Sequence, residues 1–375
     1  MRIIQAKYVS GSWHYLSDKV TLKNPLVLVF GDRFILETEK LIKKVEKEFP
    51  YKNIVYSSTA GEILGANVTT NELVVTAIDF EKTKFEIRTA NIHNHKLNSF
   101  NLANSLIKEL PNEGLKHVFV VSEGSFVNGS ELLDGLDAEK EKSFCITGGL
   151  SGDGTRFEKT LAGHNEIKEG EVVLIGLYGK TLEISFSSLG GWIPFGPERT
   201  ITKSDKNVLY ELDGQPALDL YSKYLGEKAS ELPQASLLYP LYVREEGAKH
   251  PVVRTILNID RENQTMILAG NVPQGSRAQL MMASADALLE GAREAAKLAM
   301  KARKNTPELA LLISCIGRRL VLDQRAEEEI EEVIDIIGDN VSVGGFYSYG
   351  EIAPFHGEKT SSLHNQTMTL TLISE

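Results

Sequence analysis

The order of apolar and polar positions predicts a strand and then a helix near the start of the chain. Residues 26–30 (LVLVF) form a continuous apolar run, which is typical of a strand buried on both faces. Residues 35–49 place Leu41, Val45 and Phe49 at helical spacing, with lysines on the opposite side. These two elements open an α/β unit.

A second strand and a turn of small residues continue this unit. Residues 53–58 (NIVYSS) predict a short strand, and residues 59–65 (TAGEILG) predict a sharp turn. Two alternating runs follow at residues 72–80 and 84–92, and we expect them to pair as a hairpin across the EKTK turn. The unit therefore has the order strand, helix, strand, turn and hairpin.

The same order of elements returns twice. The second set is a strand, a helix, a strand, a turn and a strand pair at residues 117–125, 131–142, 143–147, 148–154, and 171–179 with 181–189. The third set is a strand, an acidic helix, a strand, a turn and a last strand at residues 309–319, 326–337, 340–345, 346–352 and 365–373. Recurrence of one unit predicts an internal repeat and a mixed α/β (α+β) fold, with mixed sheets flanked by helices.

Two segments lie outside these units and suggest a change of domain. Residues 190–235 begin with a Gly/Pro-rich bend and continue through strand-like runs into a helix. Residues 252–304 hold two strands, a turn, and an alanine-rich helix over 283–304 that can approach a neighbour closely. We therefore expect two domains, residues 1–200 and 201–375.

Composition removes several classes of function. The 375 residues carry a formal charge of -10, which disfavours nucleic acid and anionic membranes as partners. No apolar stretch has the length of a signal peptide core or a spanning helix, so we expect a cytoplasmic protein. Cys145 and Cys315 are the only cysteines, which excludes a disulfide framework, and the histidines show no metal-binding spacing.

One segment of the chain resembles a phosphate-binding loop but lacks the glycine spacing of that motif. Residues 176–181 (GLYGKT) end in Gly-Lys-Thr, yet position 174 is leucine where that motif needs glycine. The segment also lies between two predicted strands, so we interpret it as a hairpin turn. A nucleotide-binding fold is not supported.

Three glycine-rich turns are the strongest candidates for a binding site. They span residues 58–63, 147–154 and 344–352. Glu62 and Glu351 each follow a glycine in these turns. With the strand ends at Asp32, Glu123 and Arg318 they are expected to share one rim, where open α/β sheets commonly bind ligands. The alternative is that the glycines serve only the architecture of the turns.

Cys315 offers a different chemistry. It ends a predicted strand, and Arg318 and Arg319 follow closely, so a nearby cation would lower the pKa of its thiol, with His356 or His364 as a base. The alternative interpretation is an inert buried cysteine.

Several of these motifs together resemble the FIST sensory domain. Residues 344–373 and 314–322, with the acidic helix between them, resemble the C-terminal half of that family, and residues 213–226 resemble the start of that half. The motifs STAGEILG, GGLSGDGTRF and EVVLIGLYG resemble its N-terminal half. The resemblance extends from about residue 25 to the end of the chain.

The resemblance implies a non-catalytic sensor of small molecules, with amino acids proposed as ligands. Some stand-alone members bind haem and report nitric oxide to a separate histidine kinase. The candidate ligand-binding residues are Gly61, Glu62, Gly149, Ser151, Cys315, Arg318, Tyr347, Glu351 and Asn365.

The leading hypothesis is a cytoplasmic sensor without enzymatic activity or a required cofactor. In it, Arg318 binds a ligand carboxylate, Glu62 or Glu351 binds an ammonium group, and the ligand lies between the two halves. Because no output domain is recognised in the sequence, the signal is expected to pass to a partner such as a histidine kinase. The alternatives are a haem-based nitric-oxide sensor, a Cys315-dependent hydrolase or transferase, and a purely structural adaptor.

Overall fold

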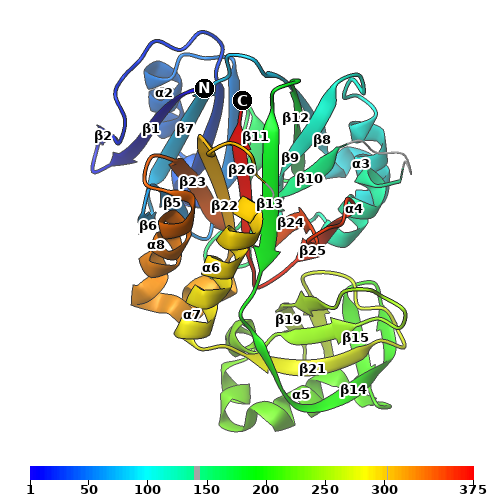
Figure 1. The fold of residues 1–375 in the computed structure, drawn as a ribbon. Coiled ribbons are helices and arrows are strands. Elements are labelled where there is room, and N and C mark those ends of the chain that lie inside the picture. Colours follow the sequence, from blue (N-terminus) through cyan, green and yellow to red (C-terminus); the bar gives the residue numbers. More distant parts are fainter. Residues whose placement is uncertain (139–143, 302) are drawn as a thin grey trace.

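The computed structural model describes residues 1–138, 144–301 and 303–375. Three six-stranded sheets form a body, and an inserted lobe with a further sheet lies below them in Figure 1. The predicted mixed α/β fold is confirmed. The end of the helix predicted over 131–142, and Ala302 in the alanine-rich helix, lie outside the described residues.

Sheet A contains the first predicted unit. Its strands in spatial order are β11 (Ala162–His164), β4 (Asn53–Ser58), β3 (Leu26–Gly31), β7 (Leu73–Asp79), β1 (Arg2–Val9) and β2 (Ser12–Tyr15). Every residue of β3 is buried, as its apolar run predicts. The helix predicted over 35–49 forms two pieces, α1 (Arg33–Leu36) and α2 (Glu39–Glu48), and the Asp32 side chain caps the first.

Sheet C contains the second unit. Its strands in spatial order are β25 (Ser361–His364), β24 (Gly350–Pro354), β10 (Cys145–Leu150), β9 (Leu115–Ser122), β12 (Glu171–Tyr178) and β8 (Lys84–Asn91). The helices beside it are η1 (Ile92–His95), α3 (Ser99–Ile107) and α4 (Gly129–Leu136). Figure 1 shows α3 and α4 together on the outer side of this sheet.

Sheet B contains the third unit. Its strands in spatial order are β13 (Glu183–Leu189), β26 (Met368–Ser374), β22 (Leu309–Cys315), β23 (Ser342–Ser348), β5 (Glu62–Leu64) and β6 (Asn67–Thr69). Its helices are α6 (Ala285–Lys301), α7 (Ile316–Leu322), η4 (Asp323–Arg325) and α8 (Ala326–Ile337). The buried alanines of α6 allow the close approach that the sequence predicts, and the Ser187 hydroxyl donates to the Ala295 carbonyl at 2.5 Å.

The three sheets share one internal arrangement. In each, a parallel pair is extended by an antiparallel strand: β3 with β4 and β7, β9 with β10 and β12, and β22 with β23 and β26. This common order agrees with the recurring pattern in the sequence. That it arose by duplication of one unit stays a prediction.

Both predicted hairpins are wrong, because their strands belong to different sheets. β7 pairs with β1 and β3 in sheet A, whereas β8 pairs with β12 in sheet C. Likewise β12 lies in sheet C and β13 pairs with β26 in sheet B, so residues 176–181 join two sheets and do not form a hairpin turn. Alternation along a strand predicts its faces, but it carries no information about which strand becomes its partner.

Short strands in or after the predicted turns also cross between sheets. β5 and β6 extend sheet B, β11 extends sheet A, and β24 and β25 extend sheet C. Each unit therefore supplies strands to a neighbouring sheet. The chain termini meet where β26 ends and β1 begins, and the amino group of Met1 lies 3.5 Å from the Glu375 carboxylate (Figure 1).

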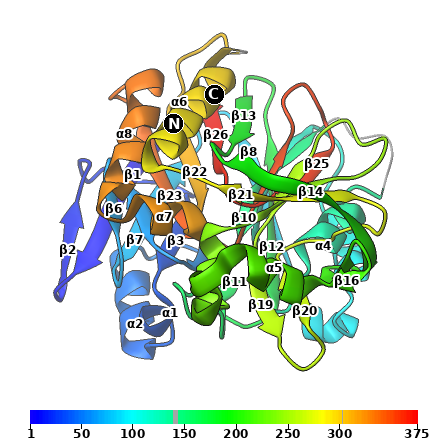
Figure 2. The ribbon, with the colours of Figure 1, turned by 90° about the horizontal axis from the view of Figure 1, so that it is seen from below.

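The inserted lobe interrupts this arrangement between β13 and α6. Its strands are β14 (Ile193–Asp205), β15 (Val208–Leu212), β16 (Gln215–Pro216), β17 (Leu241–Arg244), β18 (Val252–Arg254), β19 (Ile256–Asp260), β20 (Thr265–Leu268) and β21 (Arg277–Met282). Its helices are α5 (Ala217–Leu225), η2 (Gly226–Glu231) and η3 (Gln234–Leu238), seen from below in Figure 2. The predicted division at residue 200 stays a prediction, and sheet B combines strands from both sides of it.

Candidate functional site

The three glycine-rich turns meet at the centre of the body. The Ala60 N–H donates to the Tyr347 carbonyl at 2.8 Å, and the Tyr347 N–H donates to the Gly61 carbonyl at 2.8 Å. The Gly152 N–H donates to the Ser58 carbonyl at 3.0 Å, which joins the second turn to the first. The expected convergence of the turns is therefore present.

The centre of this junction is packed rather than hollow. Seven of the predicted site residues are buried there and line none of the cavities described below: Gly149, Ser151, Cys315, Arg318, Tyr347, Glu351 and Asn365. The rim that these turns are expected to share does not surround one cavity lined by all three, because backbone hydrogen bonds and side chains occupy the space between them.

Arg318 stabilises the scaffold and does not present its guanidinium to a ligand. Its Nε and Nη2 donate to Glu329 Oε2 at 3.0 and 2.9 Å, and Nη2 also donates to the Leu288 carbonyl at 2.8 Å. Nη1 donates to the Gly190 carbonyl, and the side chain is 0% exposed. The predicted role of Arg318 in binding a carboxylate is therefore corrected.

Glu329 is the partner that sequence reasoning missed. Besides Arg318, it accepts hydrogen bonds from the Tyr347 hydroxyl at 2.6 Å and the Ser314 hydroxyl at 3.0 Å. It belongs to an acidic run in α8, but it lies in the same helical stripe as the buried Ile330 and Val333. A carboxylate within an apolar stripe was the signal that would have found it.

Glu351 and Asn365 are also committed to internal contacts. The Glu351 carboxylate accepts from the Ser348 hydroxyl at 2.6 Å and from the Thr367 N–H and hydroxyl at 3.1 and 2.9 Å. Burial raises the pKa of Glu351 to about 7 despite these bonds. The Asn365 amide donates to the Tyr349 carbonyl at 3.4 Å.

The surroundings of Cys315 do not favour a nucleophilic thiolate. Its side chain is 1% exposed, and burial raises the pKa of the thiol. His364, one of the suggested bases, is buried with its Nε2 at 2.9 Å from the Ala353 carbonyl, and desolvation lowers its pKa to about 4. Nothing in this geometry supports the hydrolase or transferase alternative.

A cavity of about 350 Å³ lies beside the first turn, and we name it the Glu62 cavity. Its walls come from the end of β3, the turn between β4 and β5, the loop after β10, and helix α7 with η4. The lining residues are Asp32, Thr59, Ala60, Gly61, Glu62, Thr70, Asn71, Gly154, Thr155, Arg156, Ile316, Arg319, Leu320 and Asp323. Of the predicted site residues, Gly61 and Glu62 belong to it.

Glu62 is a buried carboxyl group without a cationic partner. It is 1% exposed and accepts from the Thr59 hydroxyl at 2.6 Å and the Thr69 hydroxyl at 3.4 Å. Within the part of the chain that the structure describes, no Lys, Arg or His nitrogen lies within 4.0 Å of its carboxylate. Burial raises its pKa to about 8, so the group holds a proton at neutral pH.

Arg319 supplies the positive charge that the prediction assigned to Arg318. Its Nη1 donates to the Ala60 carbonyl at 2.5 Å, and the guanidinium carbon lies 5.7 Å from the centre of the Tyr347 ring. Gly61 allows this approach, since a Cβ there would lie 3.1 Å from Arg319 Nη1 and its φ is +142°. Successive residues of a helix point about 100° apart, so Arg318 faces the core and Arg319 faces the cavity.

Asp32 and Arg156 carry charge on another wall of the cavity. Arg156 Nη2 donates to Asp32 Oδ2 at 2.8 Å. Of the strand ends expected to share a rim, Asp32 alone lines the cavity. Glu123 is buried elsewhere and accepts from the Ser125 and Phe126 N–H groups, so its expected place on the rim is corrected.

Comparison with known families identifies the family of this chain. Residues 25–215 match the FIST N domain and residues 217–354 match the FIST C domain. The chain belongs to the FIST family. FIST domains are sensory domains for small ligands. A relative is an uncharacterized protein of Methanocaldococcus jannaschii, 25% identical over 265 residues, and the match covers 62% of this chain and 49% of the relative. The chain thus spans about half the length of that curated relative.

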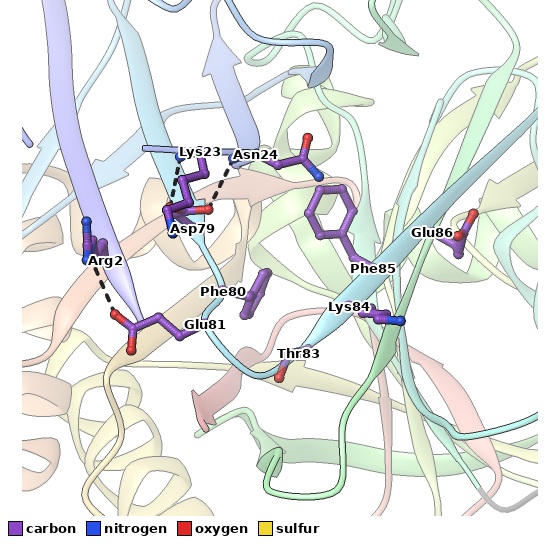
Figure 3. Close-up of a pocket in the computed structure, with 10 residues that line it drawn as sticks. All are labelled: Arg2, Lys23, Asn24, Asp79, Phe80, Glu81, Thr83, Lys84, Phe85 and Glu86. Atoms are coloured by element: carbon purple, nitrogen blue, oxygen red, sulfur yellow. Dashed lines mark hydrogen bonds and ion pairs between the residues drawn. The ribbon is translucent and has the colours of Figure 1, made fainter. Parts of the chain in front are cut away.

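The FIST chain also has a larger cavity, of about 630 Å³, between the end of β7 and the start of β8. This cavity differs from the Glu62 cavity in two ways. Figure 3 shows that two of its carboxylates have partners among the lining residues: Asp79 accepts from the Lys23 and Asn24 N–H groups, and Glu81 lies 3.6 Å from Arg2. None of the predicted site residues lines it. The Glu62 cavity is therefore the better candidate site of this FIST protein.

Haem does not fit the Glu62 cavity, because no histidine lines it. The buried His117 places Nε2 2.8 Å from the Thr147 hydroxyl, so that ring nitrogen is already engaged, as is that of His364. Among the described residues, no group of three or more His, Cys, Asp or Glu side chains is arranged to hold a metal ion. Each described helix of the FIST chain is too short or too polar to cross a bilayer.

Proposed function

We propose that this FIST protein is a small-molecule sensor whose ligand binds in the Glu62 cavity. The observation that carries the proposal is Glu62 itself, a buried carboxyl group that lines a cavity and, among the described residues, has no Lys, Arg or His nitrogen within 4.0 Å. The cavity takes its walls from both matched domains, since Gly61 and Arg156 belong to FIST N and Arg319 belongs to FIST C.

The charges of the cavity favour a ligand with an ammonium group. A proton now neutralises Glu62, and a ligand cation at hydrogen-bond distance would replace that proton and lower the pKa of the carboxyl group. Arg319 and Arg156 line the same cavity and suit a carboxylate. An amino acid carries both groups, and it is the ligand class that we propose.

A ligand that touches both matched domains would act by favouring one arrangement of them. Binding shifts a conformational equilibrium only through a difference in affinity between its states. Here the first turn and α7 are already joined by the hydrogen bond from Arg319 to Ala60, so a ligand at this seam changes how firmly the two segments hold together. We propose a separate cytoplasmic signalling protein, such as a histidine kinase, as the partner that reads the change.

Calorimetric titration with a panel of amino acids tests the proposal. Glu62→Gln should weaken binding by about tenfold or more, because a charged hydrogen bond is worth about 1.5–3 kcal/mol. Glu351→Gln is the matched control, since Glu351 is an equally buried carboxyl group in a corresponding turn but does not line the cavity. Binding that survives Glu62→Gln unchanged would remove the ligand from this site.

A further inference from the structure

A second cavity lies where the inserted lobe meets the body. It has a volume of about 340 Å³ and lies between α4 and β25 of the body and β17 and β18 of the lobe. Figure 1 shows α4 and β25 on the side of the body that faces the lobe. This cavity shares no lining residue with the Glu62 cavity.

One buried cation, Arg254, lines the cavity from the lobe. It is 7% exposed, its Nε donates to the Asn271 carbonyl at 3.0 Å, and its Nη1 donates to the Leu363 and Val253 carbonyls at 2.9 and 3.2 Å. Within the described residues, no carboxylate oxygen lies within 4.0 Å of the guanidinium, and the hydrogen bonds of this side chain are made by Nε and Nη1.

Arg318 provides a comparison with Arg254, because it is a buried arginine in the same chain whose role is structural. Arg318 is 0% exposed and pairs with the Glu329 carboxylate at 2.9 Å, and all its nitrogens donate to protein acceptors. Arg254 has carbonyl dipoles but no counter-charge. Burial lowers its pKa to about 10, so it still carries its charge at neutral pH. A buried charge without a counter-ion is costly, and an anion that reaches it is correspondingly stabilised.

The lobe and the body are closely packed against each other around Arg254. A Cβ on Gly270 would lie 2.8 Å from Leu363 Cδ2, 2.9 Å from Arg254 Nε and 2.9 Å from Ser130 Oγ. The Asn271 N–H donates to Ser130 Oγ at 3.1 Å and ties the lobe to α4 beside the guanidinium. The buried wall therefore places a fork of N–H donors next to polar groups of the body.

The acidic residues of the cavity lie at its exposed rim. Asp134 and Glu245 line it and are both exposed, so solvent screens their charges more than that of Arg254. His250 also lines the cavity, and its Nε2 lies 3.6 Å from Glu358. The cavity thus has a positive buried wall and a negative rim, which favours a small ligand with a single anionic group over a polyanion.

We propose that this cavity, which we name the Arg254 cavity, binds the oxyanion group of a small molecule, a carboxylate or a phosphate, with Arg254 as its counter-charge. The bound molecule would contact the lobe and the body together and so stabilise their present arrangement. The site is additional to the ligand site proposed above.

Titration of the full chain with propionate and, separately, with inorganic phosphate tests this site. Chloride at equal ionic strength serves as the salt control. We expect one or both oxyanions to bind, and Arg254→Met to weaken that binding by about tenfold or more, as loss of a charged hydrogen bond predicts. Binding of propionate alone or phosphate alone identifies the oxyanion, and both results support the proposal. Absence of binding by either, or unchanged binding in Arg254→Met, would overturn it.

A second variant keeps the test decisive if Arg254→Met fails to fold. Asp134→Lys leaves every hydrogen bond of Arg254 in place and reverses a charge at the rim, so it should tighten oxyanion binding severalfold. Asp219→Lys is the control for charge reversal away from the site, since Asp219 is a half-exposed helical aspartate that pairs with Lys223 and does not line the cavity. Equal effects of the two reversals would place the anion elsewhere and contradict the proposal.

Discussion

Arg319 donates a 2.5 Å hydrogen bond to the carbonyl of Ala60, and this bond joins helix α7 to the turn that carries Glu62. The two residues are 259 positions apart in the chain. Through this contact the FIST C domain reaches the candidate site in the FIST N domain.

Neighbouring arginines of α7 should have different roles. Arg318→Met leaves the buried Glu329 carboxylate without its cation, so we expect the free energy of unfolding to fall by about 3–5 kcal/mol. Arg319→Met removes one half-buried hydrogen bond and should cost about 0.5–1.5 kcal/mol while weakening ligand binding. Urea denaturation measures the first effect and calorimetry the second. Equal losses of stability in the two variants would contradict this division.

The stability of the protein should depend on pH through Glu62. The pKa of Glu62 is about 8 in the folded chain and near 4.5 in the unfolded chain. The contribution of protonated Glu62 to the free energy of unfolding is therefore full below pH 4.5 and is lost as the pH rises through about 8. Glu62→Gln should therefore be close to neutral at pH 4 and stabilising at pH 9, on the order of 5 kcal/mol. Urea denaturation across this range measures the difference. A variant that is equally stabilising at both pH values would refute the assignment.

A side chain at position 61 should lower the free energy of unfolding, because the backbone conformation and the neighbouring atoms there suit glycine. An alanine there would adopt φ +142° and place Cβ 3.1 Å from both Arg319 Nη1 and Tyr347 Cδ2. We expect Gly61→Ala to cost about 2–3 kcal/mol. Gly196→Ala is the control, because Gly196 also has positive φ (+71°) but a Cβ there would meet nothing within 4 Å, and it should cost about 1 kcal/mol. Thermal denaturation compares the two variants.

Cys315 should be unreactive in the folded protein. In a Cys145→Ala background, alkylation of Cys315 by iodoacetamide at neutral pH should be at least about a hundredfold slower than in urea, since burial raises the thiol pKa and blocks access. Mass spectrometry follows the labelling. Rapid labelling of the folded chain would revive the covalent-catalysis alternative.

The crossings between sheets predict tolerance to circular permutation. A variant that joins Glu375 to Met1 by a short linker and opens the chain at residues 180–182 should fold cooperatively, because its termini would lie at a corresponding crossing. Its stability should stay within about 2 kcal/mol of the parent by urea denaturation. Failure of this variant to fold would show that the crossing between β12 and β13 is essential.

Local patterns were enough for most elements and for part of the site. The buried run of β3, the acidic helix α8 and the alanine-rich α6 each follow from apolar spacing, which depends only on the periods of helix and strand. Strand β21 in the lobe went unpredicted, because it follows directly on a glycine-rich turn and precedes a helix. Of the nine candidate ligand-binding residues, Gly61 and Glu62 line the Glu62 cavity, and of the strand ends expected at the rim, Asp32 does so too.

What the amino-acid sequence determined by itself was most of the strands and helices, the mixed α/β class and the kinship with FIST domains. Only the tertiary structure decided that β8 and β13 cross to other sheets, that Arg318 faces inward to Glu329, and that Arg319 and Arg254 line cavities. The physical reason is range: periodicity depends on neighbours along the chain, whereas strand pairing and the acceptors of buried donors can lie far away in sequence. β13 pairs with β26, Arg319 bonds to Ala60 across 259 positions, and Arg254 bonds to Leu363 across 109 positions.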